Sequence, residues 1–188
     1  MALDLKFAES VLNLNHRVLG KRLKPFSLWH ALLLEATRSP IWAGQGPITL
    51  PDLHAAVAIC SNEWPKFNLK AGFFTILRNS CISDDRLQFE GKKLIAYFND
   101  YNSVPMLWTE DKKDFKEKPR CPLPLSLDLV AWLVRHGFGE ARSWNMPIGL
   151  AHWYYIACAR QRGGEIDLVS PEEQLVIDQV KAKNAATS

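Results

Sequence analysis

Few residues in this sequence have the types and spacing that catalysis requires. The chain contains no GxxxxGKS/T phosphate loop, no GxGxxG motif after a strand, no HExxH and no GxSxG. His152, next to Trp153, is the best candidate for a general base. No Cys, Ser or carboxylate stands at an informative spacing from it, so we interpret His152 as a structural residue on a core helix. We therefore expect a protein that is not an enzyme.

The cysteines and histidines do not predict a metal site. The four cysteines lie singly along the chain, at Cys60, Cys81, Cys121 and Cys158. A structural zinc site usually shows two ligands within a few residues, because one turn must present both. The five histidines do not supply that spacing either. We expect free thiols, no metal and no cofactor.

One basic cluster could contact phosphate groups. It lies in a stretch without acidic residues, between positions 10 and 34, and consists of Arg17, Lys21, Arg22 and Lys24. Four cations without interleaved aromatic residues are typical of a solvated loop, so we expect nucleic acid to be an unlikely partner. A weaker hypothesis stays open, in which the chain binds nucleic acid through residues 17–24. The affinity would then fall steeply as the salt concentration rises.

The tryptophans are the best candidates for contacts with another protein, because Trp is enriched in interfaces. The chain has seven, and several fall at the ends of expected helices or in loops. The helix expected over 147–162 is apolar on nearly every side, so each side needs a cover. We predict an open edge near Trp144 and Trp153. This edge is either covered by residues 66–108 or forms a groove for a partner.

The pattern of apolar residues and caps predicts an all-α fold, a compact bundle of about six or seven helices. Ser27 and Thr49 can cap helices, as can Ser126. Ser170 opens a full capping box. The expected helices cover residues 3–19, 28–38, 50–60, 84–101, 127–136, 147–162 and 171–183. A short β element around 164–169 is an alternative, and residues 42–47 read as a loop.

The length of 188 residues and the hydrophobic share of 47% predict one domain over residues 1–183. Residues 109–124 form an exposed linker or loop, because they are dense in charge and proline. The expected organisation is N-terminal helices over 1–64, a variable middle over 65–108, this loop, C-terminal helices over 125–183, and a frayed tail over 184–188.

Charge and hydropathy favour a cytoplasmic protein. Charged residues make up 23% of the chain and the net charge is +3. The stretch Ser143–Ala159 is uncharged, but it is too short and too polar to span a bilayer. Asp4, Lys6 and Glu9 stand where a signal peptide would be apolar. We expect no membrane association.

The order of several local motifs resembles the tail assembly chaperones encoded by tailed phages and prophages. The matching segments are Val18–His30, Ser39–Ile41, Pro51–Cys60, Met146–Tyr154 and Gly163–Glu173. The resemblance implies a protein of the host cytoplasm that binds the tape-measure protein and keeps it soluble during tail assembly. An alternative is a phage accessory protein that binds a host or defence-system protein. Both are binding proteins without a catalytic site.

Overall fold

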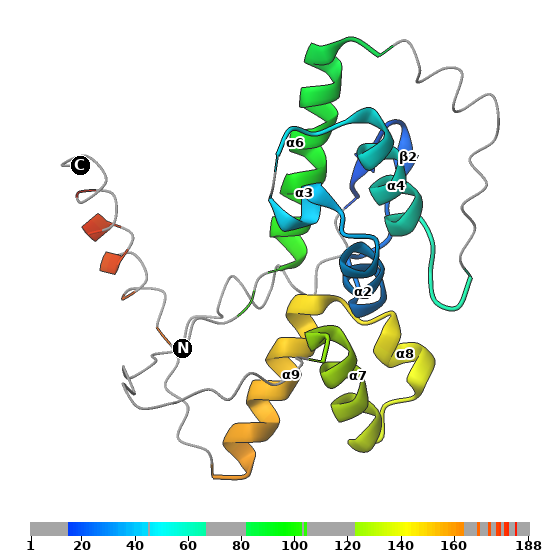
Figure 1. The fold of residues 1–188 in the computed structure, drawn as a ribbon. Coiled ribbons are helices and arrows are strands. Elements are labelled where there is room, and N and C mark those ends of the chain that lie inside the picture. The colour runs from blue at the N-terminus through cyan, green and yellow to red at the C-terminus, as the bar shows by residue number, and fades with distance from the viewer. Residues whose placement is uncertain are drawn as a thin grey trace.

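The computed structural model describes four parts of the chain (Figure 1). These are residues 15–66 without 45, residues 82–102 with 104, residues 123–163, and the single positions 169, 173, 176, 177, 179, 180 and 183. Residues 109–122 of the loop expected over 109–124, and residues 164–168 of the β element expected over 164–169, lie outside the described residues, as do Ser170 of the capping box and the tail over 184–188.

Within the described residues the fold is helical, which confirms the predicted all-α class. Seven helices and one small antiparallel hairpin occur there. In chain order they are β1 (Arg17–Val18), β2 (Lys21–Arg22), α2 (Leu28–Ala36), α3 (Pro40–Ala43), α4 (Leu50–Cys60), α6 (Asp84–Tyr101), α7 (Leu125–Arg135), α8 (Glu140–Trp144) and α9 (Ile148–Gln161). No helix in these parts has both the length and the apolar character needed to cross a membrane.

The helix starts predicted at Ser27 and Thr49 are confirmed. The Ser27 hydroxyl accepts a hydrogen bond from the backbone N–H of His30, and Thr49 accepts one from Asp52. Each cap satisfies a backbone donor that the first helical turn leaves without a partner. In α2 a second hydrogen bond completes a capping box, because His30 Nδ1 accepts from the N–H of Ser27 at 3.1 Å.

The predicted cap at Ser126 is wrong. Helix α7 begins two residues before the predicted Leu127, with Pro124 as its N-cap. The Pro124 carbonyl accepts hydrogen bonds from the N–H groups of Leu127 and Asp128. Ser126 is therefore inside the helix and buried. The predicted end is correct, because Gly137 follows the helix with φ of 89°, a value that favours glycine.

Two further local predictions need correction. Residues 42–47 do not form a continuous loop, because Pro40 starts the short helix α3, a first-turn position that proline favours. The predicted helix over 3–19 does not reach Val18, because residues 17 and 18 form β1. The chain reverses at Leu19 and Gly20, with φ of 51° and 77°, so β2 can pair with β1.

Helix α2 lies at the centre of the body. It contacts α3 and α4 on one side and α7, α8 and α9 on the other. In Figure 1 the hairpin, α3, α4 and α6 lie above it, while α7, α8 and α9 lie below. Two backbone hydrogen bonds join the start of α2 to the start of α9. The Leu28 N–H donates to the Met146 carbonyl, and the Ile148 N–H donates to the Phe26 carbonyl. The start of α2 and the start of α9 thus fix each other.

Aromatic rings fill the core next to α6. The Phe26 ring lies 4.9 Å from Phe98, 5.0 Å from Trp42 and 5.7 Å from Tyr97, measured between centroids. Tyr97 is fully buried, and its hydroxyl donates to the Lys24 carbonyl at 2.8 Å. A buried phenol needs such a partner. These contacts attach α6 to the segment between the hairpin and α2.

Candidate protein-binding surface

The two tryptophans singled out in the sequence have different surroundings. Trp144, at the end of α8, is only 7% exposed and packs edge to face on Trp29 of α2, with ring centroids 5.7 Å apart. Trp153 lies on α9 and is partly buried. Trp144 is therefore part of the packing between α8 and α2 in the free chain. A contact of either tryptophan with another protein stays a prediction.

A small hollow of about 200 Å³ lies where the chain passes from the end of α8 to the start of α9. Its lining includes Arg142, Leu150 and Tyr154. The Phe138 ring lies 5.2 Å from Tyr154, and the Arg142 guanidinium lies over Phe138 at 5.4 Å. Drug-sized ligands usually occupy cavities of about 300–1,000 Å³. This hollow suits a single side chain rather than a helix.

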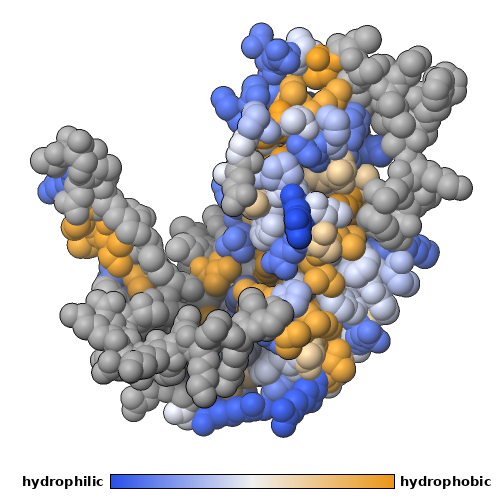
Figure 2. All heavy atoms as spheres, viewed as in Figure 1, coloured by the Kyte–Doolittle hydropathy of each residue, from blue (hydrophilic) through white to orange (hydrophobic). Residues whose placement is uncertain are grey.

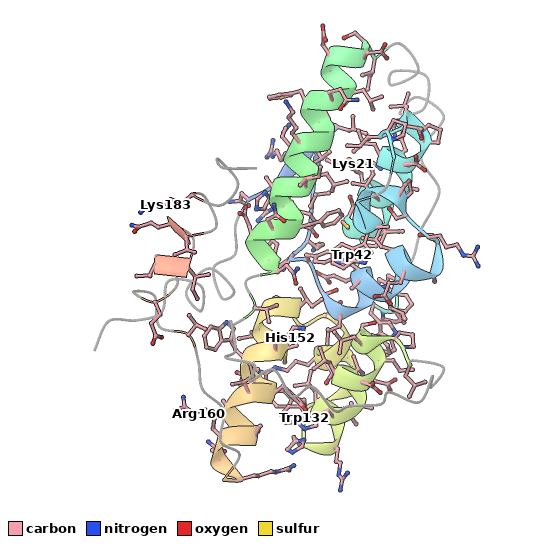
Figure 3. All side chains as sticks on the ribbon, turned by 60° about the vertical axis from the view of Figure 1, so that its left-hand side comes forward. Lys21, Trp42, Trp132, His152, Arg160 and Lys183 are labelled. Atoms are coloured by element: carbon pink, nitrogen blue, oxygen red, sulfur yellow. The ribbon has the colours of Figure 1, made fainter. Side chains whose placement is uncertain are left out.

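His152 lies on α9 and is partly buried (Figure 3). Burial lowers its pKa, so the neutral imidazole is favoured. This agrees with a structural histidine on a packed helix. Within the described residues, no group of three or more His, Cys, Asp or Glu side chains could hold a metal ion.

Sequence reasoning missed a surface on α7. Leu129, Val130 and Leu133 of this helix are buried against the body. Leu127 and Val134 are 37% and 42% exposed, although both are large and apolar. Leu127, Ala131 and Val134 follow the i, i+4, i+7 spacing, so they share one face of the helix. We call these three residues the α7 stripe.

The α7 stripe exists because α7 is apolar around most of its circumference. Asp128 and Arg135, seven residues apart, form a narrow charged line, and most other positions are apolar. Three neighbouring helices, α2, α8 and α9, contact α7. They bury one arc of the helix and leave the stripe in contact with solvent. In Figure 2, apolar side chains reach the surface in this lower part of the body.

The other flank of α7 meets α9 through aromatic contacts. Trp132 lies 5.3 Å from Tyr155, and its ring stacks on His136 at 4.0 Å. The Arg162 guanidinium lies within hydrogen-bond reach of the His136 Nε2 atom. Figure 3 shows Trp132 between α7 and α9. These contacts fix the orientation of α7, and hence the direction in which the stripe faces.

A scan of protein-family models, a search of curated proteins and a search of solved structures each find no match to this chain.

Proposed function

We propose that this chain is a binding protein of the tail assembly chaperone type, which holds a phage tape-measure protein soluble in the host cytoplasm. The observation that carries the proposal is the α7 stripe, in which large apolar side chains remain exposed on a well-packed helix. A row of exposed apolar side chains on one helix face suits packing against another apolar surface. The sequence motifs support the particular partner.

The spacing of the α7 stripe suits an amphipathic helix. Residues at i, i+4 and i+7 form a ridge that packs into the groove of a second helix. Tape-measure proteins, as the resemblance implies, present long amphipathic helices. Burying the exposed parts of Leu127 and Val134 would contribute on the order of 3 kcal/mol at about 25 cal/mol per Å². Association costs roughly 4–15 kcal/mol in lost translational and rotational freedom, so the α7 stripe would supply only part of the contact with the partner.

Co-expression tests the function directly. A tape-measure protein from the same tail module is produced with and without this chain, and the soluble fraction is measured. The proposal predicts that the tape-measure protein becomes soluble and is recovered with the tagged chain. A tape-measure protein that stays insoluble, and that the tagged chain does not retain, would contradict the proposal.

A phage deletion separates the chaperone from an accessory protein directed at the host. Loss of the gene should abolish tails on every host if the chain is an assembly chaperone. A defect confined to hosts that carry a defence system would favour the accessory protein instead, with a host or defence-system protein as the partner.

A further inference from the structure

The hairpin of β1 and β2 arranges part of the basic cluster in a fixed geometry. Arg17 pairs with Arg22, and Val18 pairs with Lys21. The N–H of Leu23 donates to the His16 carbonyl at 3.0 Å, so the pair formed by residues 16 and 23 is hydrogen-bonded. Hydrogen-bonded and non-hydrogen-bonded pairs alternate, so Arg17 and Arg22 form the closer, non-hydrogen-bonded kind. Two exposed arginines thus stand side by side on adjacent strands.

The body holds the hairpin rigidly. Val18, Leu19 and Leu23 are 0%, 5% and 3% exposed, so the apolar side chains of this segment point inward. The N–H of Leu19, at the turn, donates to the buried carboxylate of Glu90 on α6 at 2.7 Å. The arginine pair is therefore preorganised, and a ligand would not have to order it.

The charges of this pair are not neutralised within the described parts of the chain. Nearby cations do have partners there: Lys24 with Glu63 at 2.8 Å and Lys93 with Glu90 at 3.1 Å, while the Nε2 atom of His16 lies 3.2 Å from Asp100. None of these ion pairs includes Arg17, Arg22 or Lys21. Like charges directly opposite each other in a hairpin destabilise it. An anion between the two guanidinium groups would remove that repulsion.

Lys21 is a third cation of the hairpin, but it pairs with the buried Val18 and so lies on the face opposite to the arginine pair. Its ammonium lies close enough to His54 on α4 that, together with the larger effect of burial, it lowers the pKa of that imidazole. Figure 3 shows Lys21 between α6 and α4. The exposed face of the hairpin thus presents two positive charges, from Arg17 and Arg22, while the half-buried Lys21 lies toward α4.

We propose that the hairpin binds the phosphate backbone of nucleic acid through Arg17 and Arg22. Arginine guanidinium groups match phosphate oxygens in a bidentate manner. An exposed ribbon suits an extended polyanion. A membrane surface is the less favoured partner, because the apolar residues of the hairpin are buried and none can insert into a bilayer. Binding of nucleic acid by the hairpin differs from the expectation from the sequence, in which the basic cluster is a solvated loop.

This site is separate from the proposed chaperone surface. The hairpin contacts α6, whereas α7 contacts α2, α8 and α9. In Figure 1 the two lie on opposite sides of α2. Loss of nucleic-acid binding and loss of tape-measure binding can therefore be observed independently.

Fluorescence anisotropy with a short labelled DNA duplex tests the proposal. Two phosphate contacts predict that the affinity of the unaltered chain falls about 12-fold between about 50 mM and about 200 mM salt. The Arg17→Gln/Arg22→Gln variant should bind more weakly and should lose most of this salt dependence. Because the variant also loses a like-charge pair, its melting temperature should be unchanged or higher.

The matched control is Arg135→Gln/Arg160→Gln, which removes the same charge from exposed positions on α7 and α9. It should keep the salt dependence of the unaltered chain. The proposal is overturned if the unaltered chain does not bind the duplex at low salt, or if both variants weaken binding equally. It is also overturned if the chain binds vesicles of phosphatidylserine and phosphatidylcholine but not the duplex.

Discussion

The backbone N–H of Leu19 donates a hydrogen bond to the Glu90 carboxylate, 2.7 Å away in space and 71 positions away in the chain. Glu90 is only 7% exposed, and Lys93 contacts both of its oxygens at 3.1 Å. Leu19 has φ of 51°, a left-handed conformation that is uncommon for a residue with a side chain. The bond to Glu90 helps to hold this turn in place.

Replacing Glu90 should therefore destabilise the fold. Glu90→Ala leaves the Leu19 N–H buried without an acceptor, at a cost of about 1–3 kcal/mol. Glu90→Gln keeps an acceptor oxygen and should cost less. Urea denaturation followed by circular dichroism measures the free energy of unfolding of each variant. Equal losses in the two variants would show that the hydrogen bond to Leu19 contributes little.

His30 should make stability depend on pH. Its Nδ1 accepts from the Ser27 N–H and its Nε2 lies 2.7 Å from the Asn62 carbonyl, so the neutral ring with a proton on Nε2 satisfies both contacts. Burial lowers the pKa of His30 below its ordinary value of 6.5. Below about 6.5 the unfolded chain binds a proton that the folded chain does not, so stability falls as the pH decreases.

The loss should level off once the pH is below the folded-state pKa of His30. Urea denaturation at a series of pH values measures this, and His30→Gln should show a smaller loss between about pH 7 and about pH 5. The comparison between the two chains isolates His30, because His54 and His152 are present in both. Identical pH profiles would rule out His30 as a source of the dependence.

Cys60 should be unreactive in the folded protein. The side chain is fully buried, and burial raises the pKa of its thiol to about 12. Because the thiolate is the reactive form, alkylation by iodoacetamide should be very slow. Cys158 is partly exposed and serves as the comparison. Mass spectrometry of the digested protein should find Cys158 modified before Cys60, and Cys60 modified only after unfolding in urea.

Trp144 should contribute strongly to stability, since it is buried and packs on Trp29 inside the body. Trp144→Ala should cost about 3–5 kcal/mol of unfolding free energy. Trp144→Phe keeps a ring against Trp29 and should cost less. Thermal melting measures both. If Trp144→Phe melts like the unaltered chain but binds the tape-measure protein more weakly, the predicted role of Trp144 in partner contact is supported.

Local signals explain which parts of the fold were predictable. Ser27, Thr49 and Gly137 act within a few residues, so the helix ends that they define can be read from the sequence. The hairpin at residues 17–22 could not be read in this way. Its strands have two residues each, and its turn depends on Glu90, which is distant in the sequence.

The candidate surface was predictable only in part. The sequence shows that α7 is apolar on most sides, but not which side its neighbours cover. That depends on how α2, α8 and α9 pack, which is set by contacts such as Trp132 with Tyr155. From the sequence, Trp144 is expected at an open edge, because it lies in a loop between the helices expected over 127–136 and 147–162. Its burial depends on Trp29, 115 positions earlier in the chain.

The most direct test of the proposed function compares two pairs of substitutions on exposed apolar residues. Leu127→Gln/Val134→Gln alters the α7 stripe, and Phe89→Gln/Ile95→Gln alters α6. The α6 pair is a stringent control, because Ile95 and Phe89 are 41% and 61% exposed, against 42% and 37% for Val134 and Leu127. The measurement is the amount of tape-measure protein that each tagged chain retains after co-expression. Our account predicts a severe loss for the α7 pair and no loss for the α6 pair, and equal retention by both would contradict it.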